Sequence, residues 1–153
     1  ACPLSGHCGA FAQGRQLEYP VVKTRRSARH VTMVGLAIWS EGKLLMVRRP
    51  EHGLFGGLFD LPGGELSSKE SAATAARRIA IERLGLQLSS ASESGVVTHV
   101  LTHRRIKLCL LSCEVSGSLK LQHYTAHRWA EQQEALGLGI STLAKKAIGL
   151  LPQ

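Results

Sequence analysis

The sequence predicts an α+β fold in which a mixed β-sheet packs against two main helices and is preceded by an extended linker. Apolar runs of strand length recur along the chain, whereas helical periodicity is confined to two segments. The first thirty residues show neither pattern and contain several glycines and a basic run. The chain has 153 residues, of which 44% are hydrophobic and 20% charged, which suits one folded domain and excludes wholesale disorder. We therefore divide it into a linker segment, 1–30, and a domain, 31–153.

The predicted strands alternate with glycine-bearing turns. An apolar strand at 31–39 is followed by Glu41-Gly42, a pair typical of hairpin turns, and by a returning strand at 43–49. A glycine-rich loop and a short extended piece then end at Gly63-Gly64. Further strands are expected at 96–100, at 106–115 and at about 124–130, with a turn at His103-Arg104 between the first two.

Two helices are predicted from capping signals and periodicity. Ser67 and Glu70 form the Ser-x-x-Glu pattern of a capping box, so we expect the first helix to open there. Its apolar residues recur at intervals of three and four, and Gly85 ends it. The last helix is expected to open at Ser141 and to run to residue 150.

The charge balance indicates an anionic partner. The chain carries 19 Lys and Arg against 11 Asp and Glu, a formal net charge of +8. This excess favours nucleic acid, although a merely soluble basic domain has the same balance. The cations crowd two stretches: Lys23, Arg25, Arg26, Arg29 and His30 in the linker, and His103, Arg104, Arg105 and Lys107 near the predicted turn.

No part of the sequence indicates a membrane protein. No apolar run approaches the roughly 18 residues that a membrane span needs. The start of the chain also lacks the basic and apolar pattern of a secretory signal. We therefore expect an intracellular protein with no membrane partner.

The four cysteines fall into two settings. Cys109 and Cys113 lie on one face of a single predicted strand, about 13 Å apart, too far for a disulfide. We interpret them as packing residues. Cys2 and Cys8 flank a short glycine-bearing loop, a spacing that suits either a metal or a disulfide.

The first predicted helix carries a spaced set of residues that resembles the Nudix box, G-x5-E-x7-R-E-U-x-E-E-x-G-U, in which U is aliphatic. This resemblance implies a Nudix-like α/β/α sandwich. In active Nudix hydrolases the carboxylates of this helix bind divalent cations that hold a diphosphate and activate water. The matching residues are Gly64, Glu70, Arg78, Glu82 and Gly85.

Two acidic positions of that pattern are not acidic in this chain. Ile79 follows Arg78, and Arg83 follows Glu82. A hard dication needs several oxygen ligands and is repelled by a neighbouring guanidinium, so we expect no catalytic magnesium at this helix. Without such a cation, Arg78 and Glu70 are expected to form a structural ion pair.

Three further stretches, in chain order, resemble the C-terminal part of MutY, the adenine DNA glycosylase family. Cys2 and Cys8 resemble the last half of the family's C-x6-C-x2-C-x5-C iron–sulfur motif. Residues 50–62 are similar to its glycine, leucine and aromatic stretch, and residues 97–103 to its His-x-Phe-Ser-His loop. The chain is thereby identified as a fragment that begins inside the iron–sulfur motif and continues into a degenerate Nudix-like domain.

This resemblance implies a function in base excision repair. In this family the enzyme flips out and removes adenine mispaired with 8-oxoguanine, and the C-terminal domain senses the oxidised base. The glycosylase domain with the catalytic residues would precede Ala1, so no catalytic residue is expected in this fragment. A [4Fe–4S] cluster takes four cysteines, so we expect it in the parent protein and not in the fragment. We expect a monomer, located with DNA, whose partners are duplex DNA holding 8-oxoguanine opposite adenine and its own glycosylase domain.

The same resemblance assigns roles around the predicted turn. Thr102, in place of Ser, is expected to accept a hydrogen bond from N7–H, a donor that 8-oxoguanine has and guanine lacks. Leu101, in place of Phe, is expected to be an apolar wedge near the base stack, and His99 and His103 to donate to O8 or to a phosphate. Phosphate contacts are expected from Arg104, Arg105 and Lys107, and from the linker residues Lys23, Arg25, Arg26 and Arg29.

Two other functions are consistent with the sequence. One is an active Nudix hydrolase of nucleoside diphosphate derivatives such as oxidised dGTP, which would turn over with magnesium. The other is a protein-interaction module on a basic linker, which would show neither turnover nor lesion preference. Clustering of Thr102, His103, Arg104 and Arg25 on one face would argue against the interaction module.

Overall fold

The computed structural model describes residues 2–21 and 27–152 of the chain. Lys23, Arg25 and Arg26 of the predicted linker surface therefore lie outside the described residues. Within the described ranges, no helix combines the length and apolarity needed to cross a membrane. The segment before the gap contains short helical turns without buried residues: η1 (Ser5–His7), α1 (Gly9–Ala12) and η2 (Gln16–Glu18).

The domain is built on a seven-stranded sheet with the order β3-β2-β1-β6-β5, in which β4 also pairs with β1 and β7 with β2. β1 and β6 run parallel, from Arg29 opposite Arg104 to Ile38 opposite Cys113. The other pairings are antiparallel, so the predicted mixed sheet is confirmed. The strands are β1 (Arg29–Ser40), β2 (Lys43–Arg48), β3 (Phe59–Asp60), β4 (Gly63–Glu65), β5 (Gln87–Leu101), β6 (Arg104–Ser116) and β7 (Ala126–Ala130).

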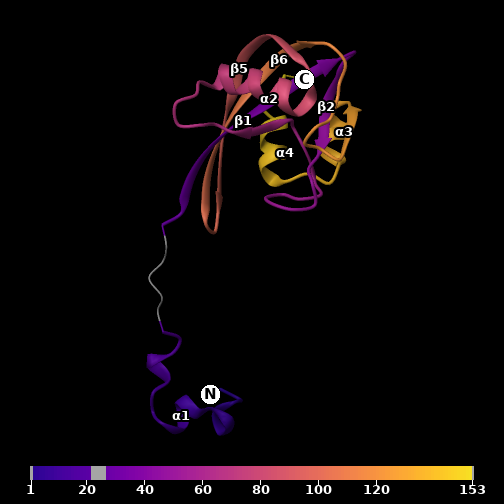
Figure 1. Ribbon diagram of the computed structural model, residues 1–153. Helices are drawn as coiled ribbons and strands as arrows, with labels where there is room; N and C mark the ends of the chain where they lie inside the picture. The colour runs from indigo at the N-terminus through magenta and orange to yellow at the C-terminus, as the bar shows by residue number, and fades with distance from the viewer. Residues whose placement is uncertain (1, 22–26, 153) are drawn as a thin grey trace.

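Helices cover both faces of the sheet (Figure 1). α2 (Ala72–Leu84) packs on one face, and α3 (Gln132–Gly137) and α4 (Thr142–Ile148) pack on the other. Alternation along β1 separates two cores, because Val31 and Met33 join the cluster that includes α4, whereas Val34 and Leu36 join the cluster that includes α2. This arrangement confirms the predicted α/β/α sandwich with two main helices.

The first main helix begins at Ser71 and not at the predicted Ser67. The Thr74 N–H donates to Ser71 Oγ at 3.1 Å, which makes Ser71 the N-cap. Ser67 and Glu70 instead close a turn in which the Glu70 N–H donates to the Ser67 carbonyl at 3.1 Å. The capping-box prediction is therefore wrong, because this turn precedes the helix. Gly85 ends the helix with a φ of 67°, as predicted.

β5 is much longer than the predicted strand at 96–100. Its first half is rich in serine, largely exposed and interrupted by register shifts against β6, between Leu88 and Ser90 and between Glu93 and Gly95. Polar residues and bulges of this kind are typical of strands at the edge of a sheet, and they remove the apolar alternation that predicts a strand. The turn after β5 is Thr102-His103, one residue earlier than predicted.

Of the two cysteines of β6, Cys113 packs in the core under α2, as predicted. Cys113 is buried and Cys109 is half-buried, and both are free thiols. Burial raises the pKa of the Cys113 thiol to about 11, so this thiol stays protonated near neutral pH.

The glycine-rich loop between β2 and β3 is tightly closed. The Gly57 N–H donates to the Pro50 carbonyl at 3.1 Å, and Arg48 Nε donates to the Gly57 carbonyl at 3.0 Å. A Cβ at Gly56 would overlap the Glu51 backbone carbonyl, so only glycine fits there. Phe55 has a φ of 59°, a left-handed conformation that costs energy for a residue with a side chain. The loop is therefore held in one shape by its own backbone.

The variant Gly56→Ala is expected to lower the free energy of unfolding by about 1–3 kcal/mol, because the loop must open to admit the methyl group. Urea denaturation would measure the change. Gly139→Ala is the matched control, since the nearest atom to its added Cβ is Leu58 Cδ2 at 4.0 Å. Equal and small effects of the two variants would contradict the tight closure.

Candidate nucleic-acid interface

The turn between β5 and β6 projects at the end of the sheet where β1 begins (Figure 1). Thr102 and His103 form the turn and are exposed, whereas Leu101 and Arg104 on either side are half-buried. The Arg29 N–H donates to the His103 carbonyl at 3.0 Å, which ties the turn to β1. A hydroxyl and an imidazole are thus presented on a backbone that is held from two neighbouring strands.

The same turn and the glycine-rich loop line an open pocket of about 350 Å³, which we call the tip pocket. Leu54 and Leu101 both pack against the core on the α4 side, so the apolar part of the pocket is anchored. The exposed side chains of Thr102 and His103 add the polar part. The lining residues are Gly53, Leu54, Leu101, Thr102, His103 and Arg104.

The tip pocket joins two stretches that are far apart in the sequence. Gly53 and Leu54 were not singled out as site residues by the sequence, although both belong to the stretch 50–62 that carries the family resemblance. The clustering of glycines after a strand is the signal that could have identified them, because glycines permit close approach to a ligand. Their position beside Thr102 follows from the tertiary structure alone.

The remaining predicted DNA contacts lie on the strands behind the turn. Arg29 and Arg104 are register partners on β1 and β6. His99 is half-buried on β5, opposite Ile106, while Arg105 and Lys107 are exposed on β6. The structure therefore gathers these five described residues at one end of the sheet, but not on one face of it. Arg25, the other member of the predicted single-face cluster, lies outside the described residues.

Arg78 of α2 and Glu70, which precedes the helix, form the predicted ion pair. Arg78 Nε and Nη2 donate to the two carboxylate oxygens of Glu70, each at 2.9 Å. The hydrogen bonds from Arg78 lower the pKa of the Glu70 carboxyl. Arg78 also donates to the Glu65 carbonyl at 3.3 Å and lies 3.6 Å from Glu82. One guanidinium thus holds the loop before α2 against the helix.

The residues around Gly64 do not fit a catalytic dication. Ile79 is fully buried in the core under α2, so its position offers no solvent-facing ligand. Arg83 Nη1 donates to the Gly63 carbonyl at 2.7 Å, and its guanidinium lies against Gly64. Among the described residues, no three His, Cys, Asp or Glu side chains group closely enough to hold a metal ion. A guanidinium placed there repels a cation, so no chemical step is assigned to magnesium.

Cys2 and Cys8 are free thiols in this structure, the first exposed and the second half-buried. The two cysteines form no disulfide with each other here. Two thiols alone do not satisfy a cluster that takes four cysteine ligands.

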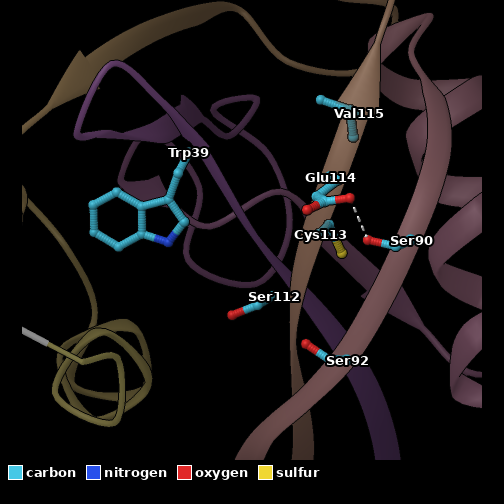
Figure 2. A pocket seen from close by; sticks show the side chains of 7 residues that line it. All are labelled: Trp39, Ser90, Ser92, Ser112, Cys113, Glu114 and Val115. Carbon is cyan, nitrogen blue, oxygen red and sulfur yellow. Dashed lines mark hydrogen bonds between the residues drawn. The ribbon is translucent and has the colours of Figure 1, made fainter.

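A second open pocket, of about 360 Å³, lies at the opposite end of β6 (Figure 2). Figure 2 shows the Trp39 indole across the hollow from the hydroxyls of Ser92 and Ser112. The Glu114 carboxylate accepts a hydrogen bond from Ser90 Oγ at 2.9 Å. No Lys or Arg is among the described residues that line this pocket, so it lacks the charge of a phosphate site.

Comparison with known proteins identifies an adenine DNA glycosylase and a MutT-like protein as relatives. The chain is 30% identical over 146 residues to an adenine DNA glycosylase from Arabidopsis thaliana, which covers 76% of this chain and 23% of that protein. It is 27% identical over 120 residues to a MutT-like protein from Streptomyces ambofaciens, covering 77% of this chain and 74% of that protein. The chain thus spans about a quarter of the length of the plant glycosylase.

Solved structures share the fold. A MutT protein from Methanosarcina mazei superposes with a TM-score of 0.74 at 22% identity, covering 81% of this chain and 94% of that one. The C-terminal domain of mouse MUTYH, solved in complex with human PCNA, gives a TM-score of 0.63 at 21% identity, with 80% and 87% covered. The model of the NUDIX domain family matches residues 33–150. The chain therefore belongs to the Nudix domain family.

Proposed function

We propose that this chain is the C-terminal lesion-recognition part of an adenine DNA glycosylase, which binds duplex DNA holding 8-oxoguanine opposite adenine. The observation that carries the proposal is the tip pocket, because two of the three stretches that resemble the glycosylase family line it. The similarity to the plant adenine DNA glycosylase supports the same reading. The basic residues behind the turn supply the charge that a DNA partner needs.

The recognition chemistry follows from one edge of the base. 8-Oxoguanine presents an N7–H donor and an O8 acceptor where guanine has a bare N7 acceptor and C8–H. The exposed Thr102 hydroxyl accepts from N7–H, and the His103 imidazole donates to O8 or to a phosphate. Plain guanine leaves this hydrogen bond unmade, at a cost of about 1–3 kcal/mol. Leu101, held by the core behind it, is the apolar group that contacts the neighbouring base stack.

Excision of the adenine belongs to a domain outside this chain in our proposal. That glycosylase domain would precede Ala1 and contribute two further cysteines, so that Cys2 and Cys8 complete a [4Fe–4S] cluster in the parent protein. The lesion part acts as a monomer located with DNA, and its own contribution is binding and orientation.

The similarity to MutT proteins favours a second candidate, a magnesium-dependent Nudix hydrolase of nucleoside diphosphate derivatives such as oxidised dGTP. The placement of Ile79 and Arg83 speaks against it, since one is buried and the other puts a cation beside Gly64. We therefore rank lesion recognition first.

Thr102→Val is expected to remove the preference of the chain for 8-oxoguanine:adenine over guanine:adenine duplexes, a preference of about 5- to 150-fold in the wild type. Fluorescence anisotropy at fixed salt measures both affinities. Thr102→Ser is the control, because it keeps the hydroxyl and should keep the preference. Equal binding of the wild type to the two duplexes would contradict lesion recognition.

Incubation with magnesium and a panel of nucleotides that includes oxidised dGTP is expected to release no pyrophosphate or phosphate above background. The physical reason is the missing carboxylate set around Gly64. Glu82→Gln serves as the control variant. Turnover that is present in the wild type and lost in this variant would establish the hydrolase in place of our proposal.

A further inference from the structure

Cations lie on both faces of the sheet where it ends at the turn. Alternation along β6 assigns these faces, since Ile106 packs in the core with α4 and Leu111 in the core with α2. Arg104 therefore shares the α4 face with Ile106, which is also the side of the tip pocket. Arg105 and Lys107 share the α2 face and are exposed there.

β1 adds basic residues to both of these faces. Arg29 is the register partner of Arg104, and His30 is the register partner of Arg105, so each face carries basic residues from two neighbouring strands. The ranges 27–32 and 96–107 contain no Asp or Glu. The carboxylate of Glu65 lies 3.5 Å from Arg29, but both side chains are more than half exposed, so this pair is weak. A positively charged surface thus lies on either side of Thr102 and His103.

The dimensions of this end match those of a DNA groove. A sheet with its side chains is about 10 Å thick, and the major groove is about 12 Å wide. The groove is about 8.5 Å deep, and a β-strand rises about 3.4 Å per residue. When one residue of a strand touches a base edge, the rim of the groove therefore lies beside the residues about two to three positions further along that strand. When the turn touches a base, Arg104 and Arg105 therefore lie near the rim, where the phosphates are.

We propose that the end of the sheet inserts edge-on into the major groove of the duplex. Arg29 and Arg104 then face the phosphates of one DNA strand, and Arg105 and Lys107 face the phosphates of the other DNA strand. This inference rests on the proposed function, because it takes duplex DNA as the ligand. It also agrees with the chemistry of recognition, since N7 of a purine is presented in the major groove. Binding by one face alone would leave the cations of the other face without a partner.

Salt dependence of duplex binding tests the two faces separately. Each lost phosphate contact should lower the slope of log K against log salt concentration by about 0.9. The double variants Arg29→Gln/Arg104→Gln and Arg105→Gln/Lys107→Gln are each expected to lower the slope by about 1–2, and the quadruple variant by the sum. Lys145→Gln/Lys146→Gln, two exposed lysines on α4, is the matched control and should leave the slope unchanged.

Groove blocking supplies an independent readout with the wild-type chain. Glucosylated 5-hydroxymethylcytosine beside the lesion fills the major groove and is expected to weaken binding at least tenfold, whereas N2-methylguanine, which projects into the minor groove, should not. The edge-on insertion would be overturned by a salt slope that falls only for the Arg29→Gln/Arg104→Gln variant. Binding that tolerates the glucosyl group would overturn it as well. Either result would leave lesion preference intact, whereas loss of lesion preference in the wild type would overturn the proposed function itself.

Discussion

The parallel pairing of β1 with β6 is the contact on which the rest of the structure depends. It lies in the middle of the sheet and separates the core under α2 from the core under α4. Because parallel strands start at the same edge of a sheet, the first residue of β1 must lie beside the first residue after the turn. This geometry places Arg29 next to Arg104 and ties the His103 carbonyl to β1. Arg29, the first residue of β1, accordingly lies beside the turn.

Two guanidinium groups tie the Nudix-type helix α2 to the segments that precede it. Arg78 binds both oxygens of Glu70 and reaches the Glu65 carbonyl, and Arg83 binds the Gly63 carbonyl. These hydrogen bonds join α2 to β4 and to the loop before the helix without a metal ion. A charge-assisted hydrogen bond from a planar guanidinium is strong and directional, which suits a structural tether. The fold is thereby retained although Ile79 and Arg83 stand at two acidic positions of the Nudix box.

The tip pocket combines rigid walls with a small number of exposed polar groups. Its glycine-rich wall is closed by backbone hydrogen bonds and tolerates no side chain at Gly56, while Leu54 and Leu101 are anchored in the core. Thr102 and His103 alone extend from the turn into solvent. Rigid walls lower the conformational entropy that is lost on binding. A difference of one hydrogen bond between two ligands can therefore appear as a difference in affinity.

The periodicity of the sequence by itself determined the mixed sheet, its two main helices and the packing role of Cys113, because periodicity reports local burial. The resemblance to the Nudix box added the sandwich and the ion pair of Arg78 with Glu70. The sequence missed the first half of β5, where bulges and serines hide the alternation, and it misplaced the start of α2, because Ser67 and Ser71 both have capping partners nearby in sequence. Only the tertiary structure decided that Gly53 and Leu54 lie beside Thr102, that Arg83 reaches the Gly63 carbonyl, and that Arg29 pairs with Arg104. These contacts join residues far apart in the chain, and the register of strand pairing, which no local pattern encodes, sets them.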